Sequence, residues 1–455
     1  MNPHVLKLCE AVRVAGGRAM LVGGWVRDRL LGKESKDFDL EVYGLDPAKL
    51  RALLEQFGQV NTVGEHFSVY KLVPSIRETE ASEQNRNDER VEIDVSLPRR
   101  ESKSGQGHRG FVIEGDPFMT FEEAARRRDF TINAILFDPL TGQTVDPYDG
   151  QRDLSNRVLR VVAADTFVED SLRVLRAVQL AARFEMTIDP ETASLCRSIE
   201  LSDLPSERIW GEVEKVLTMS NHPSIGLAAA RDLGVLRRLF PELARLEEQD
   251  AGCASGNRFA HTAAALDEAA SLVNDLTKPK RIAVMMATLC HDLYPSGSSN
   301  SEDQESATRA AVSILDRLGL YGLNGYDVRS QALSLVRRNR IPMEYFEHRD
   351  AITDGDFRRL SQHVEIDLLY RVSKACEKNL SGDSTAASDW FIARARSLGV
   401  EHGPPAPLLL GRHLLEAGFS PGPEMGNLLR YVYEMQLDGK ITTQTEALAA
   451  ARQIG

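Results

Sequence analysis

Cysteine is scarce in this sequence, and its five cysteines are widely separated, with no C-x-x-C pair. This spacing argues against a disulfide framework or a zinc knuckle and favours a reducing, cytoplasmic environment. No apolar run approaches the ~20 residues that would span a bilayer, so we expect no membrane partner. The N-terminal segment also lacks the basic head, apolar core and cleavage site of a secretion signal. These absences exclude disulfide-rich secreted proteins and membrane-spanning proteins.

Positive charge is also in deficit, since the net charge is -12. A nucleic-acid-binding protein usually has an excess of lysine and arginine. The basic residues are, however, unevenly distributed along the chain. Within the first half they form a cluster that consists of Arg99, Arg100, Lys103, Arg109, Arg126, Arg127, Arg128, Arg152, Arg157, Arg160, Arg173 and Arg176. Composition therefore leaves the partner open.

The length of 455 residues predicts two to four domains. Short β-branched runs alternate with helical stretches up to about residue 160, and helical periodicity dominates from about 165 onward. Polar breaks divide the helical part. We therefore expect four regions, at residues 1–160, 161–250, 251–400 and 401–455.

The most informative stretch is LVGGWVRDRLLGKESKDFDLEVYGL. Gly23 and Gly24 follow an apolar strand and precede a helix, where a backbone without Cβ atoms and free N–H groups can receive a phosphate. Arg27 lies in the next turn and can bind the same anion. In KDFDLEV, Asp37 and Asp39 share one face of a strand, as ligands of Mg²⁺ would. Each pattern alone is common: a D-x-D can be the solvent face of an edge strand, and a Gly-Gly can be a turn.

Three further segments carry candidate binding groups. RVEIDVSL offers Glu92 and Asp94, of which Asp94 is either a third metal ligand or an exposed strand residue. AARRRDFTINAI offers Arg128 for phosphate, with Asp129 and Asn133 as ribose-type hydrogen-bonding groups; a solvated charged face is the alternative. In VEDSLRVLRAVQLAARF, a polar stripe formed by Asp170, Arg173 and Arg176 lies beside a stripe that we expect to be buried. The polar stripe could recognise the edge of a base by hydrogen bonds, or it could form surface salt bridges.

These segments together resemble the family of class II tRNA nucleotidyltransferases (CCA-adding enzymes) and bacterial poly(A) polymerases, members of the polymerase-β-like superfamily. The matching blocks are GGWVRD with KDFDLEV, RRDFTINAI with DPYDGQRDL, EDSLRVLRAVQLAARF and PSERIWGEVEKVL, and they span roughly residues 20–217. The resemblance implies an α+β fold: a nucleotidyltransferase head with a mixed sheet, then an all-α neck, an HD-like body and a helical tail.

The resemblance also implies roles for individual residues. Asp37 and Asp39 would be catalytic and hold two Mg²⁺ ions. The incoming nucleotide would be bound by Gly23, Gly24, Arg27, Arg128, Asp129, Asn133, Asp170, Arg173 and Arg176. Within that set, Asp170 and Arg173 would select CTP or ATP by pairing with the base. Gln179 stands where many relatives have a further arginine, so no role is assigned to it.

Two features distinguish activities within the family. Bacterial poly(A) polymerases resemble one another in a basic-aromatic stretch after the metal-binding strand, where this chain has Glu65 and His66. This difference favours a tRNA enzyme. The segment PRRESKSGQGHRGF resembles the flexible loop of enzymes that add all three nucleotides.

The second half resembles an HD domain. His261 in FAHTAAALDEAA and the pair His291-Asp292 in ATLCHDLYPSG could hold a divalent metal. The usual L-G-K is replaced by Leu293-Tyr294-Pro295, and Cys376 stands where a final Asp would be looked for. We therefore expect a degenerate, structural HD domain.

The sequence predicts template-independent addition of CCA, from CTP and ATP, to the 3′ end of tRNA. Poly(A) synthesis and partial addition, of CC or of A alone, stay open as alternatives within the family. A different class also stays open: an HD phosphohydrolase, or an RNA-binding protein without catalysis.

Overall fold

The computed structural model describes residues 1–62, 69–74, 92–103, 111–249, 256–294, 300–380 and 384–454. Glu65, His66 and half of the predicted flexible loop, residues 104–110, lie outside these residues. The chain forms two compact units, and each is described by itself. The first comprises Met1–Ile209 with Asp232–Gly234, and the second comprises Trp210–Arg231 with Val235–Gly455.

A mixed seven-stranded sheet forms the centre of the first unit, with the strand order β3-β4-β5-β2-β1-β8-β9. Its strands are β1 (Arg18–Val22), β2 (Phe38–Tyr43), β3 (Gly58–Thr62), β4 (Val69–Pro74), β5 (Ile93–Ser96), β8 (Leu136–Phe137) and β9 (Thr144–Val145). Strand β2 pairs antiparallel with β1 and parallel with β5. This mixed sheet confirms the predicted α+β head.

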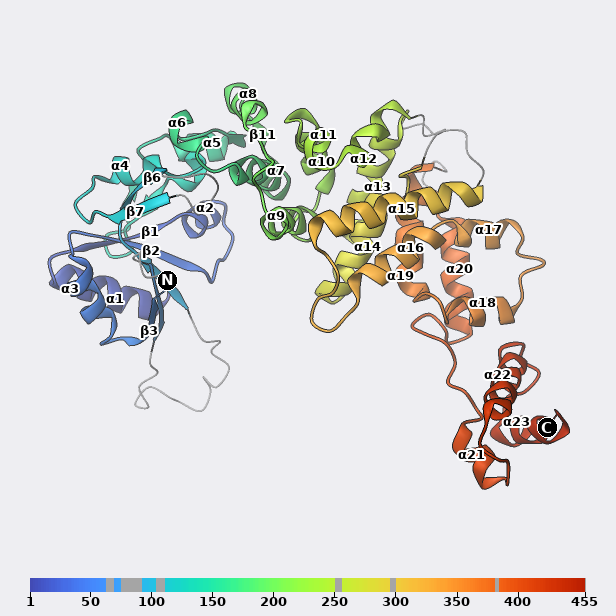
Figure 1. Ribbon diagram of the computed structural model, residues 1–455. Coiled ribbons are helices and arrows are strands. Elements are labelled where there is room, and N and C mark those ends of the chain that lie inside the picture. The colour runs from blue at the N-terminus through green and yellow to red at the C-terminus, as the bar shows by residue number, and fades with distance from the viewer. Residues whose placement is uncertain are drawn as a thin grey trace. The chain divides into compact units, whose positions relative to one another are not determined.

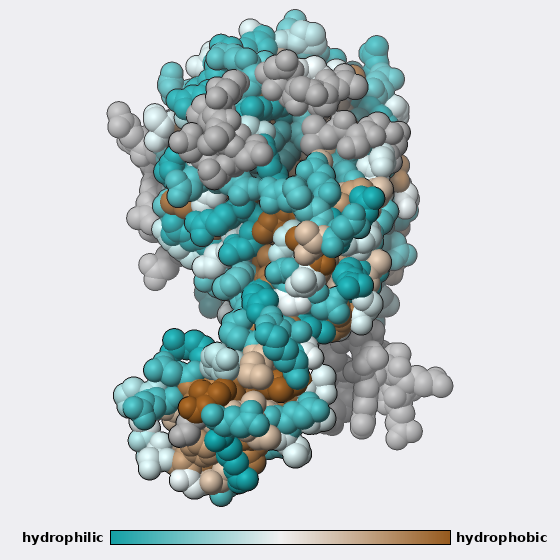
Figure 2. Space-filling model, turned by 90° about the vertical axis from the view of Figure 1, so that its right-hand side faces the viewer, coloured by the Kyte–Doolittle hydropathy of each residue, from teal (hydrophilic) through white to brown (hydrophobic). Residues whose placement is uncertain are grey.

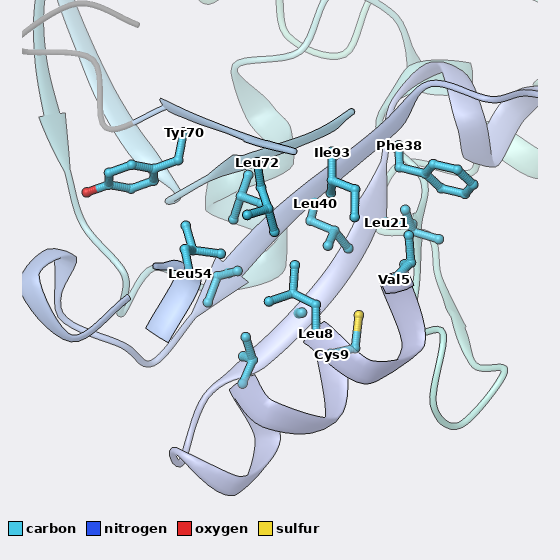
Figure 3. Packing of buried hydrophobic residues seen from close by; sticks show 14 of the residues in the cluster. Val5, Leu8, Cys9, Leu21, Phe38, Leu40, Leu54, Tyr70, Leu72 and Ile93 are labelled. Carbon is cyan, nitrogen blue, oxygen red and sulfur yellow. The ribbon is translucent and has the colours of Figure 1, made fainter. Parts of the chain in front are cut away.

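The core of the first unit lies between this sheet and helices α1 (Pro3–Val14) and α3 (Pro47–Leu54) (Figure 1). Figure 3 shows Val5 of α1 beside Leu21 of β1, and Leu8 of α1 directed toward Leu40 of β2. Phe38, Leu40 and Val42 are all buried, as their alternation with acidic residues predicts. The other face of β2 is thereby left to its polar side chains.

Short helices continue the first unit beyond the sheet. They are α2 (Gly24–Leu30), α4 (Phe121–Arg126), the 3₁₀ helix η3 (Thr131–Asn133), α5 (Gly150–Ser155), α6 (Ala164–Phe167), α7 (Leu172–Phe184) and α8 (Pro190–Ser198). Helix α5 starts directly against η3. The close approach is at Gly150, where a Cβ would lie 2.2 Å from the carbonyl oxygen of Thr131. The predicted buried stripe of α7 is confirmed by Leu172, Leu175 and Val178.

Two small two-stranded sheets complete the first unit. One pairs β10 (Val158–Leu159) with β11 (Thr187–Ile188), a small exception to the helical pattern expected after residue 165. The other is a hairpin of β6 (Arg99–Lys103) and β7 (Phe111–Gly115).

The second unit is helical throughout its described residues. It contains most of α9 (Ser206–Met219), then α10 (Pro223–Asp232), α11 (Val235–Leu239), α12 (Pro241–Ala244), η4 (Arg245–Glu248), α13 (Arg258–Leu272), α14 (Lys278–Cys290), α15 (Asn300–Leu318), α16 (Val328–Arg338), α17 (Ile341–Glu347), α18 (Asp354–Leu360), α19 (Ile366–Leu380) and α20 (Ala386–Ser397). Helices α13, α14 and α19 pack against one another (Figure 1).

The C-terminal helices have an apolar cluster of their own. Helices α21 (Gly411–Glu416), α22 (Pro423–Leu437) and α23 (Gln444–Ile454) bury Leu414, Val432 and Ala447. Figure 2 shows hydrophobic residues reaching the surface of this lobe, at the bottom of the view. Among the described residues, no helix has the length and hydropathy of a membrane span.

Candidate active site in the head

The glycine turn and the acidic strand lie side by side in the head. Antiparallel pairing of β1 with β2 places the end of β1, and therefore Gly23, next to Asp39. Gly23 has a φ of +69°, and a Cβ there would lie 3.8 Å from Asp39 Oδ2 and 3.2 Å from Arg128 Nη1. The sequence motifs around residues 23, 39 and 128 therefore meet at one point of the surface.

Asp37 and Asp39 are both exposed, but they differ in position. Asp39 belongs to β2, whereas Asp37 directly precedes the strand. Partial burial raises the pKa of Asp39 to about 6; Arg128 opposes this rise, and the neighbouring Asp94 and Asp37 add to it. The carboxylates of this face are thus close enough to repel one another, and a bound cation would relieve that repulsion.

Asp94 lies beside Asp39, since the parallel register of β2 and β5 pairs these two residues. Lys71 Nζ lies 3.7 Å from Asp94 Oδ1, too far for a hydrogen bond, and forms a closer ion pair with Glu92. This places Asp94, rather than Glu92, next to the predicted metal ligands.

Glu41 is the third acidic side chain on this face of β2, and it is completely buried. Its carboxylate accepts hydrogen bonds of 2.7 Å from Tyr43 Oη and from Arg127 Nη2. Burial alone would raise the pKa of Glu41, but the guanidinium groups of Arg128 and Arg127 lower it. Glu41 therefore holds the two arginines in place.

A buried network connects Arg27 to Arg176 through two polar side chains. Arg27 Nη1 donates to Asn133 Oδ1 at 2.8 Å, and Asn133 Nδ2 donates to Asp129 Oδ1 at 3.0 Å. Asp129 Oδ2 then accepts from Arg176 Nε at 2.7 Å, and Arg176 Nη2 lies 2.6 Å away. Although burial opposes it, Arg176 holds the pKa of Asp129 below its ordinary value. The network joins α2, η3 and α7.

Arg27 is thus occupied by protein groups in this structure. Its Nε and Nη2 donate to Asp28, and its Cζ lies 4.1 Å from the centre of the Phe184 ring. A Cβ at Gly24 would lie 3.6 Å from Arg27 Nη2, so the guanidinium runs directly beneath the glycine turn. Arg27 is placed to support this turn.

Asp170 and Arg173 are held at the start of α7. Asp170 Oδ1 accepts from the Leu172 amide at 3.1 Å, and its Oδ2 accepts from Arg208 Nη2 at 3.0 Å. Arg173 donates to the carbonyl oxygens of Thr166 and Arg127, both at 2.7 Å. These contacts fix the orientation of both side chains relative to the helix.

Sequence reasoning missed the residues that position the predicted ones. Arg127 was read as part of a basic run, but it pairs with Glu41. The signal was present, since a glutamate on a face with two aspartates needs compensating charge once it is buried. Gln179 is 3% exposed, and its Nε2 has no hydrogen-bond partner among the described residues.

The structure also brings together the three predicted HD residues of the second unit. One ligand atom each from His261, His291 and Asp292 lies within 4.8 Å of the others. Burial lowers the pKa of His261 to about 4. Burial would also lower the pKa of His291, but Asp292 raises it well above its ordinary value.

Family comparisons match both the head and the segment that follows it. Residues 19–160 match the family described as "Poly A polymerase head domain". Residues 185–246 match the family described as "Probable RNA and SrmB- binding site of polymerase A". Together these segments contain all the predicted head residues except Asp170, Arg173 and Arg176.

Two curated relatives carry the name "Multifunctional CCA protein". The one from Xanthomonas campestris is 44% identical over 230 residues, which is 49% of this chain and 50% of that protein. The one from Actinobacillus pleuropneumoniae is 38% identical over 286 residues, or 60% of this chain and 62% of that protein. The chain thus spans about half the length of the first of these relatives and somewhat more of the second.

Solved structures match over the whole chain at lower identity. The Thermotoga maritima CCA-adding enzyme complexed with tRNA has a TM-score of 0.64 and 19% identity, with 100% of this chain and 96% of that chain covered. The Bacillus stearothermophilus CCA-adding enzyme in complex with CTP has a TM-score of 0.65 and 18% identity, with 100% and 98% covered. Residues 19–160 are therefore similar to the poly A polymerase head domain, and the chain as a whole has the fold seen in the solved CCA-adding enzymes.

Proposed function

We propose that this protein adds CCA, from CTP and ATP, to the 3′ end of tRNA without a template. The observation that carries the proposal is the meeting of the Asp39 carboxylate, the Gly23 turn and the Arg128 guanidinium at one point of the head. A nucleotidyltransferase needs a metal-binding carboxylate beside a phosphate-binding turn.

The acidic face suits divalent metal, on which nucleotidyltransferases of this family depend in general. Asp37 and Asp39 supply hard oxygen ligands. Burial raises the pKa of Asp39, with smaller contributions from Asp94 and Asp37, and a bound cation would favour its ionised form. We assign two Mg²⁺ ions to these residues. Bound there, the ions would lower the pKa of the attacking 3′ hydroxyl and stabilise the departing pyrophosphate.

The remaining predicted residues divide into two groups. Gly23, Gly24 and Arg128 receive the triphosphate, because the turn lacks side chains and Arg128 points at it. Asp170 and Arg173 pair with the base of CTP or ATP, with Arg176 completing the pocket. Asp129 and Asn133 contact the ribose, and Arg27 contacts phosphate. Because Arg27 donates to Asn133 and Asp28 in this structure, its phosphate contact requires that one of these hydrogen bonds opens when the nucleotide binds.

The choice of tRNA over poly(A) synthesis is supported by the relatives, which are named as CCA proteins, and by the solved neighbours, which are CCA-adding enzymes in complex with tRNA or with CTP. Glu65 and His66, where poly(A) polymerases have a basic-aromatic stretch, favour the same choice. The four regions at 1–160, 161–250, 251–400 and 401–455 and the cytoplasmic location stay predictions.

The deciding experiment incubates the full chain with tRNA that lacks its CCA end, plus labelled CTP and ATP singly and together. CTP alone should add two residues, and both nucleotides should add three. A ladder of A residues would instead indicate poly(A) synthesis, and incorporation of one nucleotide type alone would indicate a partial enzyme. No incorporation with any nucleotide would leave the different class, a phosphohydrolase or a non-catalytic RNA binder.

A matched pair of variants tests the assignment of Asp39. Asp39→Ala should abolish incorporation while tRNA binding is retained, because the carboxylate holds metal and does not bind RNA. Glu55→Ala is the control, since Glu55 is an exposed residue directly after α3 that pairs with Arg51. Normal incorporation by Asp39→Ala would refute the assignment.

A further inference from the structure

Arg127 connects the metal-binding strand to Arg173, the arginine that is proposed to select the base. Its guanidinium Nη2 donates to Glu41 Oε1 at 2.7 Å, and its backbone carbonyl accepts from Arg173 Nη2 at 2.7 Å. The two hydrogen bonds use different parts of one residue. A displacement of the Arg127 side chain should therefore also move the carbonyl to which Arg173 donates.

Two backbone carbonyls hold the guanidinium of Arg173. Besides the carbonyl of Arg127, the carbonyl of Thr166 accepts from Arg173 Nη1, also at 2.7 Å. A guanidinium is rigid and planar, so hydrogen bonds to two of its nitrogens fix the direction of its remaining N–H groups. Thr166 lies in α6 and Arg127 directly follows α4, so the orientation of Arg173 depends on the placement of both helices.

Helix α4 depends on outside contacts at its C-terminal end. It has six residues, and so short a helix gains little stability from its own hydrogen bonds. The last carbonyl groups of a helix also lack donors within the helix, and the Arg173 guanidinium supplies one of them. Arg127 is the C-cap residue, and its side chain attaches this end of α4 to β2 through Glu41.

Glu41 is a fixed point for this attachment. Its side chain is fully buried, and it follows Asp39 by two positions on β2, so the two carboxylates share one face of the strand. Arg127 makes the short contact with it, since Arg128 Nη2 lies 3.9 Å from Glu41 Oε1. A continuous series of contacts thus runs from the metal-binding strand through Glu41 and Arg127 to Arg173.

The direction of the Arg173 guanidinium matters because donors and acceptors differ between the bases. Cytosine and adenine each present an amino group beside a ring nitrogen that accepts, whereas uracil presents a carbonyl beside an N–H group. A carboxylate accepts and a guanidinium donates, so Asp170 and Arg173 together fit CTP and ATP and oppose UTP. An Arg173 that is turned away would no longer oppose the N–H group of uracil.

We propose that Arg127 is a positioning residue for base selection: anchored by Glu41, it holds the carbonyl that directs Arg173 toward the base. Arg127 acts through Arg173 and does not itself contact the nucleotide. This inference rests on the proposed transferase function and extends it, because it names a residue outside the base-selecting pair that determines which nucleotide is accepted.

Kinetics with a correct and an incorrect nucleotide test the proposal on the full chain. The measured ratio is kcat/KM for CTP over kcat/KM for UTP, on tRNA that lacks its CCA end; losses in metal or triphosphate binding affect both nucleotides and cancel. Arg127→Met should lower this ratio about tenfold, the order expected when one hydrogen bond to a charged group is lost. Arg127→Lys, which keeps a cation for Glu41, should restore part of the ratio. Arg126→Met is the matched control and should leave it unchanged, since Arg126 is exposed and pairs with Asp165.

The outcomes separate this inference from the proposed function. An unmodified chain that incorporates neither CTP nor ATP would remove the transferase function, and the inference with it. If the unmodified chain prefers CTP to UTP and Arg127→Met slows both nucleotides equally, the positioning role alone is wrong.

A second variant covers the case in which Arg127→Met does not fold, because the buried Glu41 carboxylate loses its partner. Glu41→Gln combined with Arg127→Met removes both charges. This double variant should show the same lowered ratio of CTP to UTP, and a ratio equal to that of the unmodified chain would overturn the proposal.

Discussion

Replacement of Asp129 by asparagine tests the buried network that joins the sheet domain to α7. The oxygen of asparagine can still accept from the Phe130 amide and from Asn133, so the main loss is the charged contact with Arg176. Hydrogen bonds to charged groups contribute about 1.5–3 kcal/mol each. Because 35% of the Arg176 side chain is exposed, solvent screening reduces this value, and we expect a total loss of ~2 kcal/mol.

A double-mutant cycle with Arg176→Gln measures this coupling directly. Urea unfolding should be followed by the fluorescence of Trp25 in a background in which Trp210 and Trp390 are phenylalanine. We expect a coupling of ~1–2 kcal/mol between positions 129 and 176. Additive effects of the two replacements would refute the proposed contact. The asparagine variant should also raise the KM for CTP and ATP, since Arg176 is then free to leave the nucleotide pocket.

Three further predictions concern the head and the buried thiols. Gly23→Ala should lose activity and ~1–3 kcal/mol of stability, because φ is +69° and the new Cβ would lie 3.2 Å from Arg128 Nη1; unchanged kinetics would contradict a close phosphate approach at this turn. Because the pKa of Glu41 in the folded head lies below its ordinary value of ~4.3, the ionised carboxylate stabilises the fold at pH values above ~4.3. This stabilisation is lost as the pH falls through the lowered pKa. In urea titrations at several pH values, Glu41→Gln should therefore flatten the acid limb of the stability curve. Burial raises the pKa of both Cys9 and Cys290 to about 12, so neither should react with iodoacetamide at pH 8 until the protein unfolds; mass spectrometry of the native protein reports this.

The change from mixed to helical structure and the types of candidate ligand could be predicted from local sequence patterns, whereas the arrangement of head, neck, body and tail was implied by the resemblance to a known family. The alternation of Phe38, Leu40 and Val42 with acidic residues identified β2 and its polar face. The glycines after a strand predicted the turn at Gly23, which lies beside Asp39. Both patterns span fewer than about ten residues, the range over which periodicity determines orientation.

The partners of the site residues could not be read in this way. Contacts such as Arg27 with Asn133, or Arg127 with Glu41, join residues that are far apart in sequence. Charge alone does not distinguish an arginine that binds substrate from one that compensates a buried glutamate. The packing of helices and strands against one another determines which of these roles an arginine has. The periodicity of the sequence carries no information on that packing.

The start of α5 limits how mutations in this head can be interpreted. A methyl group at position 150 would overlap the carbonyl of Thr131 and would displace the turn that carries Asn133. If Asn133 has its proposed role at the ribose, any larger residue at 150 would thus lower activity through this displacement. In a mutational scan, loss of activity in a variant with alanine at position 150 would therefore indicate a steric overlap with Thr131. It would not show that Asp149, the neighbouring residue in the DPYDGQRDL segment, takes part in the reaction.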